Sequence, residues 1–215
     1  MRRDLILGRV VGDLRSARES QEAMVAFWRR LLLIAAFAAA CSQPAALVGT
    51  ELDMRPAPDF TLTDALTGQA QALSAFRGNV VALAFLYTHC PDTCPLTAEH
   101  FREAQKALGA DAARVQFVAV SVDPANDTPE SVRAFTSHHR LGTNWHYLVG
   151  DRSRLEVVWA LYGVGSLSNG TIFVSHNDAI YLIDRQGRER VLVHASTAQD
   201  DLTNDLRLLA REGGK

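Results

Sequence analysis

The stretch NVVALAFLYTHCPDTCP, residues 79–95, places two cysteines directly after a run of apolar residues. Asn79 to Tyr87 is nearly unbroken in its apolar character and has the length of a strand buried at the centre of a sheet. From Thr93 to Leu108, apolar residues recur on one helical face, which predicts a helix that begins inside the cysteine motif. The sequence therefore indicates a strand, a short loop with Cys90, and a helix whose first turn carries Cys94.

Elements of the same kinds follow along the chain. VQFVAVSV, residues 115–122, predicts a second buried strand. DTPESVRAFTSHH after it opens with the start signals of a helix, namely Thr128 or Asp127 as cap and Pro129 in the first turn. A short strand, another helix, and two strands joined by a turn at residues 185–187 precede a last helix that ends near residue 211. With PDFTLTDALTGQ, residues 58–69, as an additional N-terminal hairpin, this order predicts an α/β thioredoxin-like fold with a central mixed sheet flanked by helices.

The N-terminal part has the pattern of an export signal. In MVAFWRRLLLIAAFAAAC, residues 24–41, two arginines precede an uncharged run that ends in small residues and is too short for a transmembrane helix. The small residues before Cys41 resemble a bacterial lipobox, which makes Cys41 the expected lipidation site. A retained signal anchor and a cleaved, soluble form are the alternatives.

These patterns divide the chain into four parts. Residues 1–23 are expected to be an N-terminal extension or the result of a misassigned start, and residues 24–41 the export signal with its lipobox. Residues 42–57, rich in proline and alanine, are expected to be a linker, and residues 58–213 the folded domain.

Charge and compartment limit the possible partners. The chain has 22 Lys and Arg against 24 Asp and Glu, and no basic stripe suggests nucleic acid. In an exported protein, a pair of thiols tends to become a disulfide unless a ligand or a reductant prevents it. If Cys41 carries lipid, Cys90 and Cys94 are the remaining thiols.

The spacing of Cys90 and Cys94 leaves three uses open. In a regular helix, residues i and i+4 have Cβ atoms roughly 5–6 Å apart, whereas a disulfide needs about 3.5–4.5 Å. An inert disulfide therefore needs local distortion, while a metal ion between the two sulfurs fits without it. A redox pair is the third use. Against it, thioredoxins carry C-x-x-C, and no proline follows Pro129 to supply their usual cis-proline.

A histidine downstream completes a possible ligand set. His176 stands in VSHND, residues 174–178, at the entrance of the strand AIYLID, which a thioredoxin-like fold brings close to the cysteine helix. Two thiolates and one neutral imidazole suit Cu(I), and Cu(II) if a further oxygen or nitrogen joins, whereas zinc would want a fourth ligand. The alternative is a surface histidine or one that only supports the site.

These motifs make the sequence similar to the Sco/SenC family of copper proteins over about residues 58–209. PDFTLTD, FRGNVVALAFLYTHCPDTCP, VSVDPANDTPE and SHNDAIYLID occur in the order and spacing of that family. The resemblance implies a membrane-tethered copper chaperone that helps to assemble the binuclear copper A centre of cytochrome c oxidase, with Cys90, Cys94 and His176 as copper ligands. The sequence departs from the family at Ser175, where the family often has aspartate. This departure is expected to affect the choice of partner and the affinity more than metal binding itself.

The resemblance also implies partners and a location. The target is cytochrome c oxidase subunit II, a further periplasmic copper chaperone or thiol reductase is a possible partner, and the protein lies at the periplasmic face of the cell membrane. Asp123 matches a family position near the metal, where its carboxylate would tune the site or dock a partner; an Asx cap before Pro124 is the alternative. The competing function is a membrane-tethered thiol–disulfide oxidoreductase, so enzymatic activity stays open.

Overall fold

The strands form one mixed sheet. The computed structural model describes residues 46–164, 178–196 and 199–212. Within them the sheet has eight strands, in the order β1–β8–β7–β4–β5–β6–β2–β3. Their bounds are β1 Thr50–Glu51, β2 Thr61–Asp64, β3 Ala70–Ala72, β4 Val80–Leu86, β5 Val115–Ser121, β6 Trp145–Val149, β7 Ala179–Ile183 and β8 Glu189–His194. β4, β5 and β6 run parallel, whereas all other neighbours pair antiparallel, which confirms the predicted mixed sheet.

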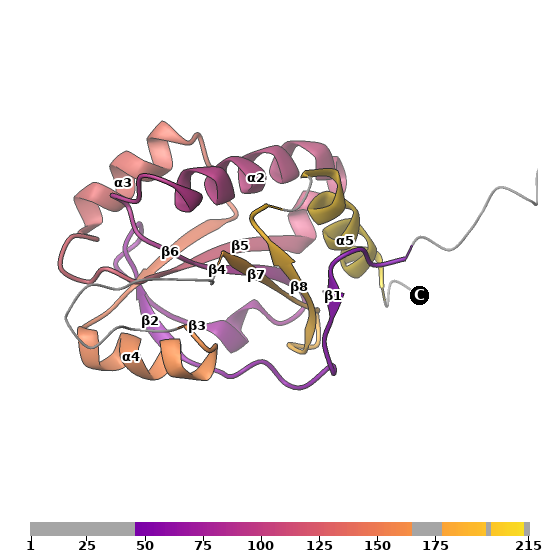
Figure 1. Ribbon diagram of the computed structural model, residues 1–215, viewed down its shortest axis with the longest axis horizontal. Coiled ribbons are helices and arrows are strands. Elements are labelled where there is room, and N and C mark those ends of the chain that lie inside the picture. Colours follow the sequence, from indigo (N-terminus) through magenta and orange to yellow (C-terminus); the bar gives the residue numbers. More distant parts are fainter. Residues whose placement is uncertain (1–45, 165–177, 197–198, 213–215) are drawn as a thin grey trace, which may run out of the picture. The chain divides into compact units, whose positions relative to one another are not determined.

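Helices cover both faces of this sheet (Figure 1). α2, α3 and α5 lie over one face, and α4 with a short 3-10 turn lies over the other. The bounds are α2 Thr93–Leu108, α3 Pro129–His138, α4 Arg152–Leu161 and α5 Gln199–Arg211, with the 3-10 turns η1 Leu73–Phe76 and η2 Gly109–Arg114. The helix predicted after the cysteine loop is confirmed as α2.

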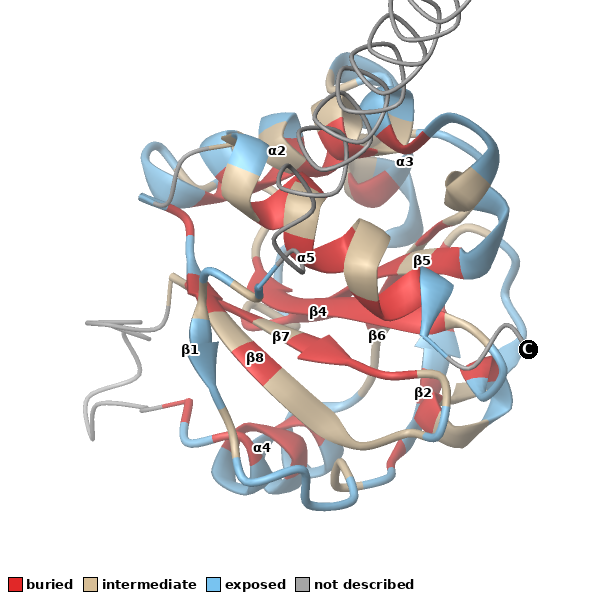
Figure 2. Ribbon diagram, turned by 90° about the vertical axis from the view of Figure 1, so that its right-hand side faces the viewer, coloured by how far each residue is buried: buried red, intermediate tan, exposed pale blue. Residues whose placement is uncertain are grey.

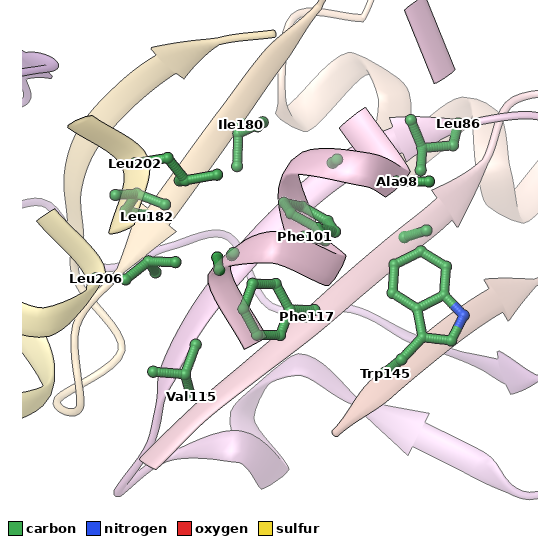
Figure 3. Close-up of a cluster of buried hydrophobic side chains, with 14 of the residues drawn as sticks. Leu86, Ala98, Phe101, Val115, Phe117, Trp145, Ile180, Leu182, Leu202 and Leu206 are labelled. Carbon is green, nitrogen blue, oxygen red and sulfur yellow. The ribbon is translucent and has the colours of Figure 1, made fainter. Parts of the chain in front are cut away.

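The face under α2 holds an aromatic cluster (Figure 3). Phe101 of α2 is fully buried, and its ring centroid lies 5.0 Å from that of Phe117 in β5 and 6.0 Å from that of Trp145 in β6. Leu202 and Leu206 of α5 belong to the same cluster. Figure 2 shows the central strands buried beneath these helices, which explains why β4 is apolar on both of its faces. The packing fixes α2 against the sheet and so determines where its first turn lies.

The folded part begins before residue 58. Within residues 42–57, which the sequence indicates as a linker, β1 pairs with β8, and the N–H groups of Val48 and Gly49 donate to Asp205 of α5 at 2.8 and 3.0 Å. Asp205 is fully buried. Composition could not show this contact, because the bond to Val48 joins residues 157 positions apart.

The expected export signal, residues 24–41 with Cys41, lies outside the described residues, as does the extension at residues 1–23. Among the residues that are described, none of the helices has the length and apolar character needed to span a bilayer.

Candidate metal centre

Three segments meet at one edge of the sheet. β4 and β5 run parallel, so the loops that follow them leave at the same edge, and β7 runs antiparallel to β4 and starts there. A small pocket lies between the segment that follows β4 and the segment that precedes β7. Its lining includes Tyr87, Cys94 and Thr97 from the former and Asp178 from the latter. The topology thus brings the cysteine loop, the loop after β5 and the entrance of β7 together.

Cys90 and Cys94 are free thiols at the start of α2. Cys94 lies in the first turn and is buried, with 4% of its surface exposed, whereas Cys90 in the preceding loop is half-buried. The first N–H groups of a helix have no partner within it, and the side chain of Asp92 does not cap α2. Instead, the N–H of Cys94 donates to Sγ of Cys90 at 3.4 Å. The sulfur of Cys90 therefore occupies the capping position of the helix.

The two thiols differ in acidity. Burial raises the pKa of Cys90, but the S–H of Cys94 and the backbone N–H groups of Asp92 and Cys94 donate to its sulfur and leave the pKa below its usual value. Burial raises the pKa of Cys94 well above its ordinary range, and the hydrogen bond to Cys90 raises it further. Cys90 is therefore the thiol that ionises first.

Tyr87 contacts both cysteines. Its hydroxyl hydrogen-bonds to Cys90, its carbonyl accepts the N–H of Cys90 at 3.3 Å, and its backbone N–H bonds to Cys94. Burial, followed by the bond to Cys90, raises the pKa of Tyr87 to about 12, so the phenol stays protonated at neutral pH. No role is predicted for Tyr87 from the sequence motifs, although a tyrosine at the end of an otherwise apolar strand is a signal for a polar partner.

Asp127 holds the loop that carries the cysteines through hydrogen bonds to Thr88. Its carboxylate is buried, with 4% exposed, and Oδ1 accepts both the N–H and the hydroxyl of Thr88 at 2.8 Å. Oδ2 accepts the hydroxyl of Ser121 at 2.6 Å and that of Tyr147 at 2.9 Å. The sequence suggested Asp127 only as a possible helix cap, but the cap of α3 is Thr128, which accepts the N–H of Ser131. Asp127 instead joins the loop after β4 to β5 and β6.

Asp123 lies in the loop after β5, as predicted. Its carboxylate accepts the side-chain amide of Asn126 at 2.8 Å, and its carbonyl accepts the N–H groups of Asn126 and Asp127. Its charge also contributes to raising the pKa of Tyr87, after burial and the two cysteines. Asp123 therefore stabilises a turn around Pro124 and acts electrostatically on the cysteine site.

The third predicted ligand, His176, lies outside the described residues. Among the residues that are described, no three His, Cys, Asp or Glu side chains group closely enough to hold a metal ion. His89, next to Cys90, lines a separate hollow with Pro95, with His138 at the end of α3 and with His139 directly after it. The structure thus brings together two of the three predicted ligands.

The fold and the paired thiols define a thioredoxin-like protein with a C-x-x-x-C site after a central strand. The chain belongs to the SCO1/SenC family, whose model matches residues 50–211. The copper-bound structure of ScoI from Bradyrhizobium japonicum is similar, with 30% identity, 72% of this chain and 99% of that chain covered, and a TM-score of 0.62.

Two further solved structures extend the comparison. BsSco, in which a disulfide switch was identified, is a member of the Sco family of cytochrome c oxidase assembly proteins. It has 25% identity and a TM-score of 0.64, with 78% of this chain and 99% of BsSco covered. A SCO1/SenC family lipoprotein from Bacillus anthracis has 27% identity and a TM-score of 0.64, with 75% and 98% covered. The predicted family and thioredoxin-like fold are confirmed.

Proposed function

We propose that this protein is a copper-binding chaperone that delivers copper to, or prepares, the copper A site of cytochrome c oxidase. Cys90, Cys94 and His176 bind the ion, as Cu(I), Cu(II) or both. The observation that carries the proposal is the pair of free thiols at the first turn of α2, in a family with a copper-bound member.

The chemistry of the two thiols supports copper as the cargo. Thiolate is the ligand that Cu(I) prefers, and the lowered pKa of Cys90 increases the fraction of its sulfur that is thiolate at a given pH. Cys90 is half-buried rather than enclosed, so an incoming ligand can reach the sulfur. A chaperone needs this access, because the ion must leave by ligand exchange.

The position of Asp178 supports His176 as the third ligand. Asp178 lines the pocket beside Cys94, and β7, which begins one residue later, pairs with β4. Two residues of chain span at most about 7 Å. His176 precedes Asp178 by two residues, so its Cα lies within this distance of the Cα of Asp178. Imidazole is also a common copper ligand.

An anaerobic Cu(I) titration of the reduced protein against a competing chelator tests the proposal. Wild type is compared with His176→Ala, Cys90→Ser and Cys94→Ser. The matched control is His138→Ala, which removes an exposed imidazole on α3. We expect one tightly bound copper in wild type and in the control, and binding weaker by at least about tenfold in the other three. Equal binding by wild type and His176→Ala would remove His176 from the ligand set.

A second function is favoured by the different acidities of the thiols. A half-buried thiol of lowered pKa followed by a buried thiol of raised pKa is the arrangement of an attacking and a resolving cysteine in thiol–disulfide exchange. In this alternative, the protein reduces cysteines of its target. Reduction of a peptide disulfide that survives His176→Ala but is lost in Cys90→Ser would favour the reductase over the chaperone.

We further propose that residues 24–41 direct export and that lipid on Cys41 holds the protein at the periplasmic face of the membrane. Cytochrome c oxidase subunit II is the proposed target, and a periplasmic copper chaperone or thiol reductase a further partner. The lipobox-like sequence and the similarity to a SCO1/SenC lipoprotein support the anchor. Mass spectrometry of the membrane-extracted protein tests it, because an unmodified Cys41 would contradict lipidation.

A further inference from the structure

The carboxylate of Asp127 is buried near the cysteines, although Asp127 is not one of the proposed copper ligands. Its Oδ1 accepts the N–H and the hydroxyl of Thr88, and its Oδ2 accepts the hydroxyl of Ser121. The hydroxyl of Tyr147 shares its hydrogen between Oδ2 of Asp127 at 2.9 Å and the carbonyl oxygen of Leu86 at 3.1 Å. Among the described residues, the carboxylate is thus held in the interior by neutral dipoles and by no cation.

This charge lies close to the cysteines. Thr88, which donates to it twice, stands two residues before Cys90. Tyr147, a third donor, shares a buried cluster with Cys94. Asp127 therefore holds the loop that leads to Cys90 and places its carboxylate beside the cluster that contains Cys94.

We propose that Asp127 is a positioning residue that also sets the preference of the site for Cu(II) over Cu(I). The inference rests on copper binding by Cys90 and Cys94. Cu(I) with two thiolates carries a net negative charge, whereas Cu(II) with the same thiolates is neutral. A fixed negative charge nearby therefore disfavours the Cu(I) complex relative to the Cu(II) complex. At an effective dielectric of about 20, one such charge at a separation of about 10 Å changes the ratio of the two affinities by on the order of tenfold.

The variant Asp127→Asn separates charge from shape. The amide has nearly the same volume, and its oxygen can keep the bonds from Thr88. Its NH₂ then faces the hydroxyls of Ser121 and Tyr147, which can rotate to accept. The loop keeps most of its contacts while the charge is lost. Asp127→Ser, which also removes the charge but leaves a hydroxyl, is the second variant if the amide prevents folding.

Two controls isolate the effect. Thr88→Val removes one bond to Asp127 but leaves its charge, so it should weaken both affinities alike. Asp205→Asn removes a buried carboxylate that binds Val48 and Gly49 at the start of the folded part. Within the described residues, Asp205 hydrogen-bonds to Val48, Gly49 and Asn204 and to neither cysteine, so the variant should leave the ratio of affinities unchanged.

The experiment measures Cu(I) and Cu(II) affinities of the full-length protein with a competing chelator for each ion. We expect the Cu(I) to Cu(II) affinity ratio to rise by about tenfold in Asp127→Asn, with a higher copper reduction potential, and to change less than about twofold in both controls. An unchanged ratio in Asp127→Asn, or the same rise in Thr88→Val, would overturn the inference while the copper function stands. If wild type binds no copper, both fail.

Discussion

Asp205→Ala tests whether the segment before β1 belongs to the folded protein. The carboxylate of Asp205 is fully buried and accepts the N–H groups of Val48 at 2.8 Å and Gly49 at 3.0 Å. A hydrogen bond to a charged group contributes about 1.5–3 kcal/mol, so two such bonds contribute roughly 3–6 kcal/mol. Val48 is 54% exposed, and water replaces part of its bond. We therefore expect a loss of about 3 kcal/mol, at the lower end of that range.

Urea denaturation followed by circular dichroism measures this loss. For a protein of this size, about 3 kcal/mol corresponds to a decrease of roughly 6–12 °C in the melting temperature. The matched control is Asn204→Ala, which removes an exposed bond to the carbonyl of Ala46 at 3.1 Å and a longer bond to Oδ1 of Asp205 at 3.3 Å, and should cost less than about 1 kcal/mol. A loss below about 1 kcal/mol in Asp205→Ala would show that residues 48 and 49 are not held against α5 in solution.

Three further predictions concern α2 and α3. Phe101→Ala should lower the unfolding free energy by about 3–5 kcal/mol in urea denaturation, because its ring is fully buried against Phe117; a loss below about 1 kcal/mol would contradict the packing. Alkylation by iodoacetamide near pH 7.5, followed by peptide mass mapping, should modify Cys90 before Cys94, because the pKa of Cys90 is lowered and that of Cys94 is raised. As pH rises, the rate at Cys90 should level off first, and the reverse order would refute the assignment. Thr128→Ala should lower the unfolding free energy by about 1 kcal/mol, because α3 loses its N-terminal cap. An unchanged urea denaturation midpoint would contradict this role of Thr128.

Local patterns were sufficient to predict the elements that carry the site. The bounds of α2 follow from helical periodicity, and Thr128 and Asp151 cap α3 and α4 through bonds to residues only three positions away. The burial of β4 follows from its unbroken apolar run, since a strand covered on both faces needs no polar positions. These signals act within a few residues and are therefore visible in sequence.

The contacts that support the cysteines are of another kind. Asp127 binds Thr88 across 39 residues of sequence, and its role depends on parallel strands that end at the same edge of the sheet. The prediction of a linker at residues 42–57 missed the folded residues 48 and 49 for the same reason, because their partner Asp205 lies on the last helix. Nothing in the local composition marks either pair.

The sequence by itself determined which atoms the protein offers for chemistry: two thiols in C-x-x-x-C, after a buried strand and at the start of a helix. Their number and spacing are covalent facts, and the surrounding elements follow from local periodicity. The tertiary structure alone decided that Cys90 ionises before Cys94. That difference depends on burial, on the N–H groups at the start of α2 and on charges such as Asp127 that folding brings near. Acidity is a property of the environment, and only the folded chain supplies that environment.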